Sequence, residues 1–179
     1  MISGAEEILD IVDENDQVIG KKSRSDIYSE GLKNYRVVNA FVVNSEGKLW
    51  IPRRTASKKL FPLALDMSVG GHVSSGENYD FAFKRELEEE LHMNSENIFY
   101  VLLGHLSPYK HGVSAFMNVY EIKYNDIPNY EKNDFFEYFW LSPKEILDKL
   151  SAGDIAKSDL SKIVKIFYLK GAKNNGHPS

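Results

Sequence analysis

Four glutamates crowd one short stretch of the chain, namely Glu86, Glu88, Glu89 and Glu90. If this stretch is helical, the spacing of three and four residues puts Glu86, Glu89 and Glu90 on one face, while Glu88 points away into solvent. Carboxylate and phosphate oxygens are the ligands that Mg²⁺ and Mn²⁺ prefer, and such a cation neutralises phosphate oxyanions and activates an attacking water. The spacing therefore predicts a divalent-metal site for cleaving a diphosphate.

A glycine-rich turn comes directly before the expected helix. Gly70 and Gly71 allow a metal or ligand to approach the backbone closely, and Gly76 allows a second sharp bend. Without this turn, the acidic run is typical of a solvated helix face, with Arg85 in an ordinary i,i+4 pair with Glu89. The turn favours the metal-site interpretation over that alternative.

Turn and helix together resemble the Nudix box, in which a glycine, five residues, a glutamate and seven residues precede Arg-Glu-aliphatic-x-Glu-Glu-x-Gly-aliphatic. The matching residues are Gly71, Glu77, Arg85, Glu86, Leu87, Glu89 and Glu90, with Met93 as the final apolar residue. A motif with this many fixed positions is highly specific, and on it the chain resembles the Nudix hydrolase superfamily. The longer pattern from LDIVDENDQVIG through PRRTASKKLFPLALDMSVGGHVSSGE is similar to the branch that includes isopentenyl-diphosphate isomerase and its hydrolase-like relatives.

This resemblance implies an α/β (α+β) architecture, the Nudix fold, with a mixed β-sheet sandwiched between α-helices and the box at 71–93 as loop–helix–loop. It implies that Mg²⁺ or Mn²⁺ is held by Glu86, Glu89 and Glu90, joined in some members by Glu77 and the carbonyl of Gly71. It also implies that Arg85 orients the glutamates by salt bridging, and that Arg85, Glu89 and Glu90 belong to the catalytic set.

One position departs from the box, because His92 stands where the motif has a glycine near the helix end. A glycine there suits a left-handed C-terminal cap. Histidine tolerates that conformation better than most side chains, although Asn94 could end the helix slightly later instead. The replacement of this glycine by His92 affects the expected end of the helix more than the expected metal ligands.

Two enzyme activities are distinguished by residues outside the acidic run. In the isomerase, the resemblance implies a cysteine just before the Gly-His pair and a metal bound through several histidines. Here Gly70 occupies the position of the cysteine, Tyr35 lies near an expected histidine, only His72 matches, and the chain has no cysteine. We therefore expect hydrolysis, by water attack at phosphorus, of a nucleoside diphosphate linked to another moiety. The isomerase and a non-catalytic nucleotide-binding Nudix module remain alternatives.

The general base that deprotonates the water is expected to be Glu90 or Glu137, because a glutamate in the strand that contains Glu137 has this role in some relatives. Arg53 and Arg54 precede the box and are candidates for contacting phosphates, and His72 for contacting substrate. Two of these residues have an ordinary alternative: Glu137 as an exposed strand carboxylate, and His72 as a polar turn residue.

The elements that position these residues are predicted from apolar periodicity and turn signals. We expect one domain over 1–172 that begins with a β-hairpin at about 8–22, followed by a tail at 173–179 without fixed structure. A final amphipathic helix is expected to be capped by Ser158 and closed by Gly171. The remaining strands are expected at 35–44, 48–53, 97–106, 113–124 and 135–141, and the remaining helices at 23–31, 78–93 and 143–150.

Composition excludes several other classes of protein. The 179 residues are 42% hydrophobic with a net charge of −4, which gives no reason to expect a nucleic-acid surface but allows a small phosphorylated, nucleotide-derived substrate. The absence of cysteine excludes disulfides and thiolate metal sites. No apolar run approaches the roughly 20 residues of a membrane span, and the N-terminal stretch lacks the pattern of a signal peptide, so a cytoplasmic location is expected. The edges of the hairpin could pair two copies as a homodimer.

Overall fold

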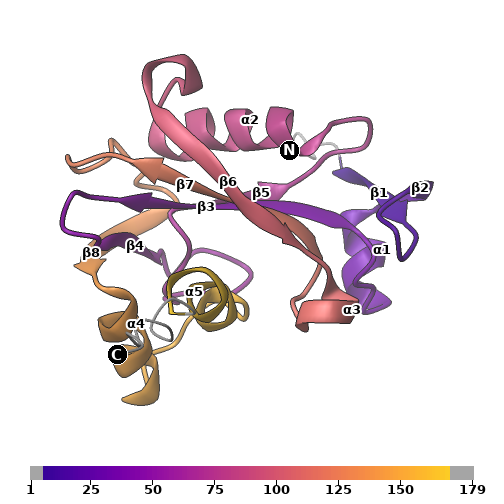
Figure 1. Cartoon of the computed structure of the whole chain (residues 1–179). Helices are drawn as coiled ribbons and strands as arrows, with labels where there is room; N and C mark the ends of the chain where they lie inside the picture. Colours follow the sequence, from indigo (N-terminus) through magenta and orange to yellow (C-terminus); the bar gives the residue numbers. More distant parts are fainter. Residues whose placement is uncertain (1–5, 170–179) are drawn as a thin grey trace, which may run out of the picture.

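The β-sheet at the centre of the fold is mixed and six-stranded, with helices on both faces (Figure 1). The structure, a computed structural model, describes residues 6–169, so the predicted end of the domain at residue 172, the tail at 173–179 and Gly171 lie outside the described residues. The elements are β1 (Ile8–Val12), β2 (Val18–Ser23), α1 (Arg24–Ser29), β3 (Arg36–Val43), β4 (Leu49–Arg54), β5 (Val69–His72), α2 (Tyr79–Leu91), a 3₁₀ turn (Ser95–Asn97), β6 (Phe99–Leu106), α3 (Pro108–His111), β7 (Phe116–Lys123), β8 (Phe135–Leu141), α4 (Pro143–Ser151) and α5 (Leu160–Tyr168).

The sheet has the strand order β6-β7-β3-β4-β8, with β5 added beside β3. β3 and β7 run parallel, and the other pairs are antiparallel. β4 leaves β3 after the pair Val43–Leu49, and β5 then pairs with the first half of β3, from Val37–His72 to Ala40–Val69. This divergence places the two glycines of β5 at the centre of the sheet, below the box helix.

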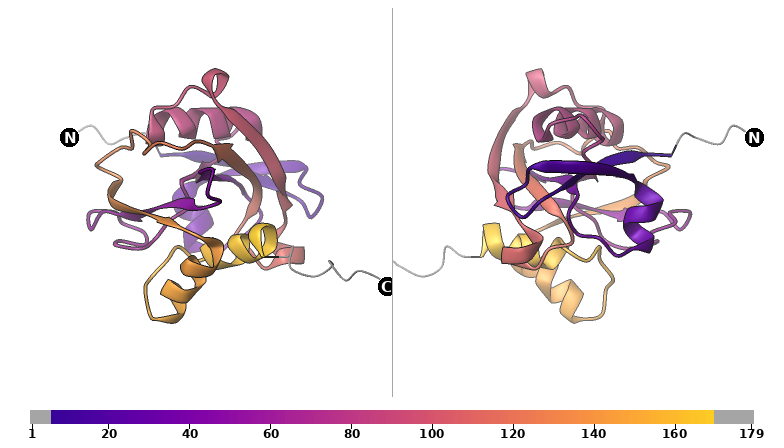
Figure 2. Two further views of the ribbon diagram at one scale, coloured as in Figure 1. Left: turned by 60° about the vertical axis from the view of Figure 1, so that its left-hand side comes forward. Right: turned by 90° about the vertical axis from the view of Figure 1, so that its right-hand side faces the viewer.

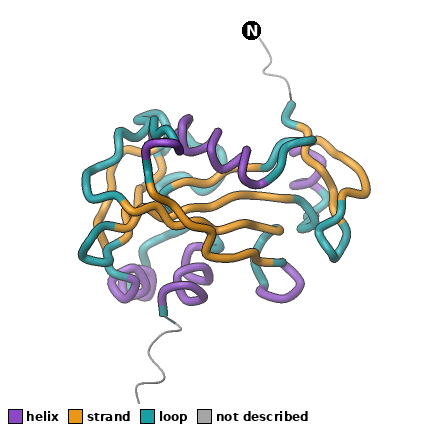
Figure 3. The backbone as a smooth tube through the Cα atoms, turned by 45° about the horizontal axis from the view of Figure 1, so that its top comes forward, coloured by secondary structure: helices purple, strands orange, loops and turns teal. Residues whose placement is uncertain are grey.

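Helix α2 covers one face of the sheet and α4 and α5 the other, which Figure 3 shows as purple coils on both sides of the orange strands. On α2, Phe83, Leu87 and Leu91 are spaced four residues apart, form one apolar stripe along the helix and are fully buried against the sheet. The ring of Phe83 stacks on Tyr120 of β7 at 4.1 Å between centroids. Burial of each such side chain contributes roughly 1.5–3 kcal/mol, so this stripe fixes the rotation of α2 about its axis.

The predicted N-terminal hairpin is confirmed as β1 and β2, which pair antiparallel as a separate two-stranded sheet. It lies with α1 at one end of the large sheet (Figures 1 and 2). Ser23 accepts a hydrogen bond from the backbone N–H of Asp26 and so caps α1. The N–H of Ser75, just after β5, donates to the carbonyl of Ile8 in β1 at 2.8 Å and so holds the hairpin beside β5. The hairpin and α1 together are called the hairpin wall below.

Two local expectations were wrong. Ser158 does not cap α5, which begins at Leu160 after Asp159 in the N-cap position. Asp159 makes no cap bond either, because its carboxylate accepts hydrogen bonds from both N–H and Oγ of Ser114 instead. A short helix, α3, also forms between the strands expected at 97–106 and 113–124, where no helix was expected; Ser107 accepts from Tyr109 N–H and Pro108 opens the first turn. Across residues 6–169 no helix combines the length and apolar character needed to cross a bilayer.

Candidate active site

The glycines of β5 leave room for one particular carboxylate. A Cβ added to Gly71 would lie only 2.0 Å from Cδ and Oε1 of Glu86, a distance that real Cβ atoms essentially never show. The carboxylate of Glu86 therefore occupies the space that any side chain at position 71 would need. Beside it, the N–H of Gly70 donates to Oε2 of Glu90 at 2.9 Å. Gly70 and Gly71 thus bring the strand backbone into contact with two glutamates of α2.

Helix α2 is defined at both ends by local hydrogen bonds. Asn78 caps its N-terminus by accepting a hydrogen bond from Phe81 N–H at 2.8 Å, and Asp80 lies in the first turn. His92 ends the helix in the left-handed conformation, with φ 50° and ψ 35°, and its N–H donates to the carbonyl of Glu88 at 3.0 Å. His92 therefore takes over the conformation of the glycine that it replaces, while Asn94 caps only the following 3₁₀ turn.

Arg85 of α2 links the helix to the preceding glycine-rich turn through several hydrogen bonds. Its Nε and Nη2 donate to the two carboxylate oxygens of Glu77 at 2.9 and 3.0 Å, and its Nη1 donates to Glu86 at 2.7 Å. Nη2 also donates to the carbonyl of His72 at 2.9 Å, and Glu89 lies at 3.5 Å. The Arg85 guanidinium lowers the pKa of Glu77, which keeps that carboxylate charged as its partner. The expected orienting role of Arg85 fits this geometry.

Glu86 and Glu90 are partly buried acids whose ionised forms are disfavoured by their surroundings. Burial raises the pKa of Glu86 to about 7, although Arg85 acts in the opposite direction. Burial and then the charge of Glu86 raise the pKa of Glu90 well above its ordinary value, against the Gly70 N–H and Lys157. By contrast, the side chain of Glu89 is 59% exposed. A bound cation would stabilise the ionised form of both carboxyl groups.

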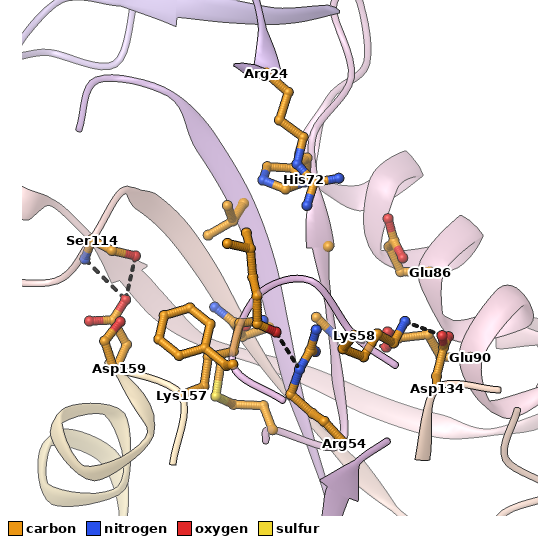
Figure 4. Close-up of a pocket in the computed structure, with 18 of the residues that line it drawn as sticks. Arg24, Arg54, Lys58, His72, Glu86, Glu90, Ser114, Asp134, Lys157 and Asp159 are labelled. Atoms are coloured by element: carbon orange, nitrogen blue, oxygen red, sulfur yellow. Dashed lines mark hydrogen bonds and ion pairs between the residues drawn. The ribbon is translucent and has the colours of Figure 1, made fainter. Parts of the chain in front are cut away.

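A cavity of about 520 Å³ opens in front of these carboxylates. Glu86, Glu89, Glu90 and Gly71 line it on the side of the box, and Figure 4 shows Glu86 and Glu90 on one side with Ser114 and Asp159 facing them across the opening. Within residues 6–169, no three His, Asp or Glu side chains converge closely enough to hold a metal ion by themselves. The donors that do lie close to β5, the carboxylates of Glu86 and Glu90, are the hard oxygen ligands that suit Mg²⁺ or Mn²⁺. Glu89 could add a third by turning its exposed side chain.

Comparison with known proteins decides the family. The NUDIX domain matches residues 33–160 of the chain. The chain belongs to the Nudix family. It is 62% identical over 162 residues to an uncharacterised Nudix hydrolase of Nostoc sp. strain PCC 7120, covering 90% of this chain and 96% of that protein. It is also 44% identical over 164 residues to a Nudix hydrolase of Deinococcus radiodurans, covering 92% of this chain and 95% of that protein.

A solved structure gives the same result for the fold. The crystal structure of DR0079 from Deinococcus radiodurans superposes with a TM-score of 0.86 at 45% identity, covering 90% of this chain and 99% of that chain. The Nudix fold predicted from the box is therefore confirmed, with its mixed sheet, flanking helices and N-terminal hairpin. As a member of the Nudix hydrolases, the protein acts on acid anhydrides in phosphorus-containing compounds. Nudix hydrolases in general use a divalent metal and a small phosphorylated substrate.

Not every residue predicted for the Nudix site lies at the cavity. Glu77 does not line it, and both of its carboxylate oxygens accept hydrogen bonds from Arg85. Arg53 and Glu137 face each other on β4 and β8 and form an ion pair away from the cavity, and Arg53 also makes two hydrogen bonds to Asp154 at 2.8 and 2.9 Å. The structure therefore gives Arg53 and Glu137 a role in joining strands to the loop before α5.

Arg54 and His72 do line the cavity. Arg54 donates to the buried carboxylate of Asp66 at 2.7 Å. His72 shares a hydrogen bond of 2.7 Å with the hydroxyl of Tyr28. Burial, followed by the charge of Arg24, lowers the pKa of His72 to about 3, so its imidazole is neutral at pH 7.

Several cavity residues were missed by the sequence reasoning because they lie far from the Nudix box. They come from the hairpin wall, from β3, from the loop after β4 and from the segment before α5, and they include Arg24, Tyr28, Asn39, Phe61 and Lys157. No local pattern marks them, since each is an unremarkable residue in its own segment. Only the pairing of β5 with β3 and the return of the chain at 155–157 bring them together.

Proposed function

We propose that this Nudix protein hydrolyses the diphosphate of a nucleoside diphosphate linked to another moiety, with Mg²⁺ or Mn²⁺ as cofactor. The observation that carries the proposal is the pair of carboxyl groups of Glu86 and Glu90, which line an open cavity beside Gly71 and whose pKa values are raised by desolvation, so that a bound cation would be needed to keep both charged. With Glu89, these residues would hold the metal. When bound, the metal would neutralise phosphate oxygens and acidify the attacking water.

The chain's own residues have defined roles in this scheme. Arg85 holds Glu86 in place by the hydrogen bond at 2.7 Å and keeps Glu77 beside the turn. Of the two candidate bases, Glu90 lines the cavity and Glu137 does not, so Glu90 is the better candidate for taking the proton from water. The water oxygen bonds to phosphorus, the phosphorus–oxygen bond of the anhydride breaks, and the displaced phosphate leaves with the electron pair.

The other residues that line the cavity favour a substrate that carries an organic group. Tyr28, Tyr35, Leu60 and Phe61 line the cavity together with the carboxylates, and the residues Leu60 and Phe61 are both 42% exposed. Aromatic and aliphatic side chains of this kind favour a planar base or another apolar moiety over inorganic diphosphate alone. A nucleotide-derived substrate therefore fits the cavity better than a purely anionic one.

Two other functions are less well supported. An isomerase would need the cysteine that Gly70 replaces, and the sequence contains none. A non-catalytic binding module would not need the intact set of box carboxylates that lie buried or at the cavity.

The proposal is tested by a panel of nucleotide-sugars, dinucleotides, nucleoside triphosphates and isopentenyl diphosphate, each with Mg²⁺ and with EDTA. We expect Mg²⁺-dependent cleavage of at least one diphosphate-linked nucleotide, with Glu90→Gln lowering kcat far more than Glu137→Gln. Saturable nucleotide binding without turnover would favour the binding module. Double-bond migration in isopentenyl diphosphate would instead identify an isomerase.

A further inference from the structure

Lys157 reaches the cavity from a segment that is held firmly in place, far along the chain from the Nudix box. Its backbone N–H donates to the carbonyl of Leu65 at 2.9 Å, and Leu65 N–H donates to the carbonyl of Ile155 at 2.9 Å. These bonds form a short parallel bridge between Leu65 and the residue before Lys157. Three positions earlier, Asp154 is fixed by two hydrogen bonds from Arg53. The fold thus fixes the backbone from which the Lys157 side chain extends.

The ammonium of Lys157 lies next to the acidic side of the cavity. A Cβ added to Gly70 would be 3.4 Å from Nζ, so the ammonium lies against the residue whose N–H donates to Glu90. Its charge lowers the pKa of Glu90, against the larger opposite effect of burial. The side chain keeps 29% of its surface exposed and lines the cavity, so its tip is accessible to a ligand.

Lys157 differs from the other cations around the cavity in how little it is bonded. Arg54 donates to Asp66, Lys58 to Asp134, and Arg24 to Glu7. For Lys157, the only ion pair among residues 6–169 is with Oδ1 of Asp66 at 3.5 Å, and its Nζ makes no hydrogen bond there. Asp66 is already paired with Arg54 at 2.7 Å. Because an ammonium carries three donors, Lys157 has capacity for an anionic oxygen at the cavity.

We propose that Lys157 is a substrate-binding residue that donates to a phosphoryl oxygen of the diphosphate beside Glu86 and Glu90. This inference rests on the proposed diphosphate hydrolysis and adds a binding residue outside the Nudix box. An ammonium and a divalent cation held by adjacent carboxylates repel each other, and a diphosphate placed between them is attracted to both. Lys157 therefore opposes binding of the metal alone and favours binding of the diphosphate, two effects of opposite sign.

The test uses Lys157→Met, Lys157→Arg and, as a matched control for charge, Lys144→Met, whose side chain is 82% exposed on α4 and does not line the cavity. Calorimetry measures the Kd of Mn²⁺ alone and the Kd of methylenediphosphonate, which has no hydrolysable bridge, at saturating Mn²⁺. Thermal unfolding checks that each variant is folded.

For Lys157→Met we expect Mn²⁺ alone to bind about threefold more tightly than to the wild type, because a repelling charge is removed. We expect methylenediphosphonate to bind about tenfold more weakly, the effect of losing one charge-assisted hydrogen bond. Lys157→Arg should retain most of the diphosphonate affinity, and Lys144→Met should match the wild type. Unchanged diphosphonate affinity in Lys157→Met overturns the proposal, and so does a parallel loss of Mn²⁺ and diphosphonate affinity, which would mean a structural role.

The failure of the proposed function is distinguishable from the failure of this inference. If the wild type binds methylenediphosphonate with Mn²⁺ but turns over no member of the substrate panel, hydrolysis fails while the comparison of Lys157 variants still decides the binding role. If the wild type binds no methylenediphosphonate at saturating Mn²⁺, the role of Lys157 is refuted directly.

Discussion

Replacing Gly71 with alanine tests whether the position of Glu86 limits activity. The new methyl carbon would lie 2.0 Å from Cδ and Oε1 of Glu86, and real Cβ contacts under 3.0 Å are essentially never seen, so the carboxylate must move by about 1 Å. Misplacement of a catalytic group by about 1 Å can cost on the order of 10²-fold in rate. We therefore expect kcat/KM of Gly71→Ala to fall by about 10²-fold, with the Kd for Mn²⁺ raised as well.

The assay is Mg²⁺-dependent turnover of the best substrate from the panel, combined with calorimetric titration of Mn²⁺. Gly20→Ala is the matched control, because a Cβ there meets nothing within 4 Å. A double-mutant cycle adds Glu86→Asp, which withdraws the carboxylate by about one carbon–carbon bond. If the clash acts through Glu86, the double variant should be hardly worse than Glu86→Asp alone. Wild-type activity in Gly71→Ala, or purely additive losses in the cycle, would refute this reasoning.

Three further predictions follow from contacts around the site. Arg85→Lys loses the paired hydrogen bonds to Glu77, so steady-state kinetics should show a loss of about 10–100-fold in activity; an unaffected rate would contradict the orienting role. Arg53 lowers the pKa of Asp154 from 3.8 to about 2, so the stability from this carboxylate is complete above pH of about 4 and lost as the pH falls towards 2. Urea unfolding should show that Asp154→Asn lowers stability at pH 7 by about 1–2 kcal/mol and removes this pH dependence, whereas an unchanged pH slope would disprove the link. Because His92 has φ 50°, His92→Gly should raise the free energy of unfolding by about 0.5–1 kcal/mol, and a loss of stability would show that the histidine side chain matters more than its backbone.

The box helix could be predicted from sequence because its determinants are local. The stripe of Phe83, Leu87 and Leu91 sets the buried face, and the same periodicity places Glu86 and Glu90 beside it. The left-handed cap at His92 was also foreseeable, since the motif has a glycine there. The confirmed fold and hairpin depended on the same kinds of signal, namely apolar alternation, turns and a long motif.

The composition of the cavity was not foreseeable, because it depends on contacts between distant segments. The adjacent arginines of β4 look alike in sequence, yet Arg54 lines the cavity while Arg53 is directed to Glu137 and Asp154, because successive residues of a strand face opposite sides. Lys157 reaches the cavity because its backbone N–H donates to the carbonyl of Leu65, a residue far away in the sequence. Ser158 was chosen as the cap of α5 from residue type alone, but the helix starts later, after Asp159.

The central claim, metal-dependent attack of water on a diphosphate at Glu86, Glu89 and Glu90, is tested most directly by hydrolysis in ¹⁸O-labelled water. The substrate from the panel is incubated with Mg²⁺, with EDTA, and with the Glu89→Gln and Glu90→Gln variants, and the products are analysed by ³¹P NMR and mass spectrometry. We predict one ¹⁸O atom in a phosphate product, turnover that stops in EDTA, and a drop in kcat of at least about 10²-fold in both variants. Undiminished turnover in EDTA or in both variants, or products without ¹⁸O on phosphorus, would contradict the account.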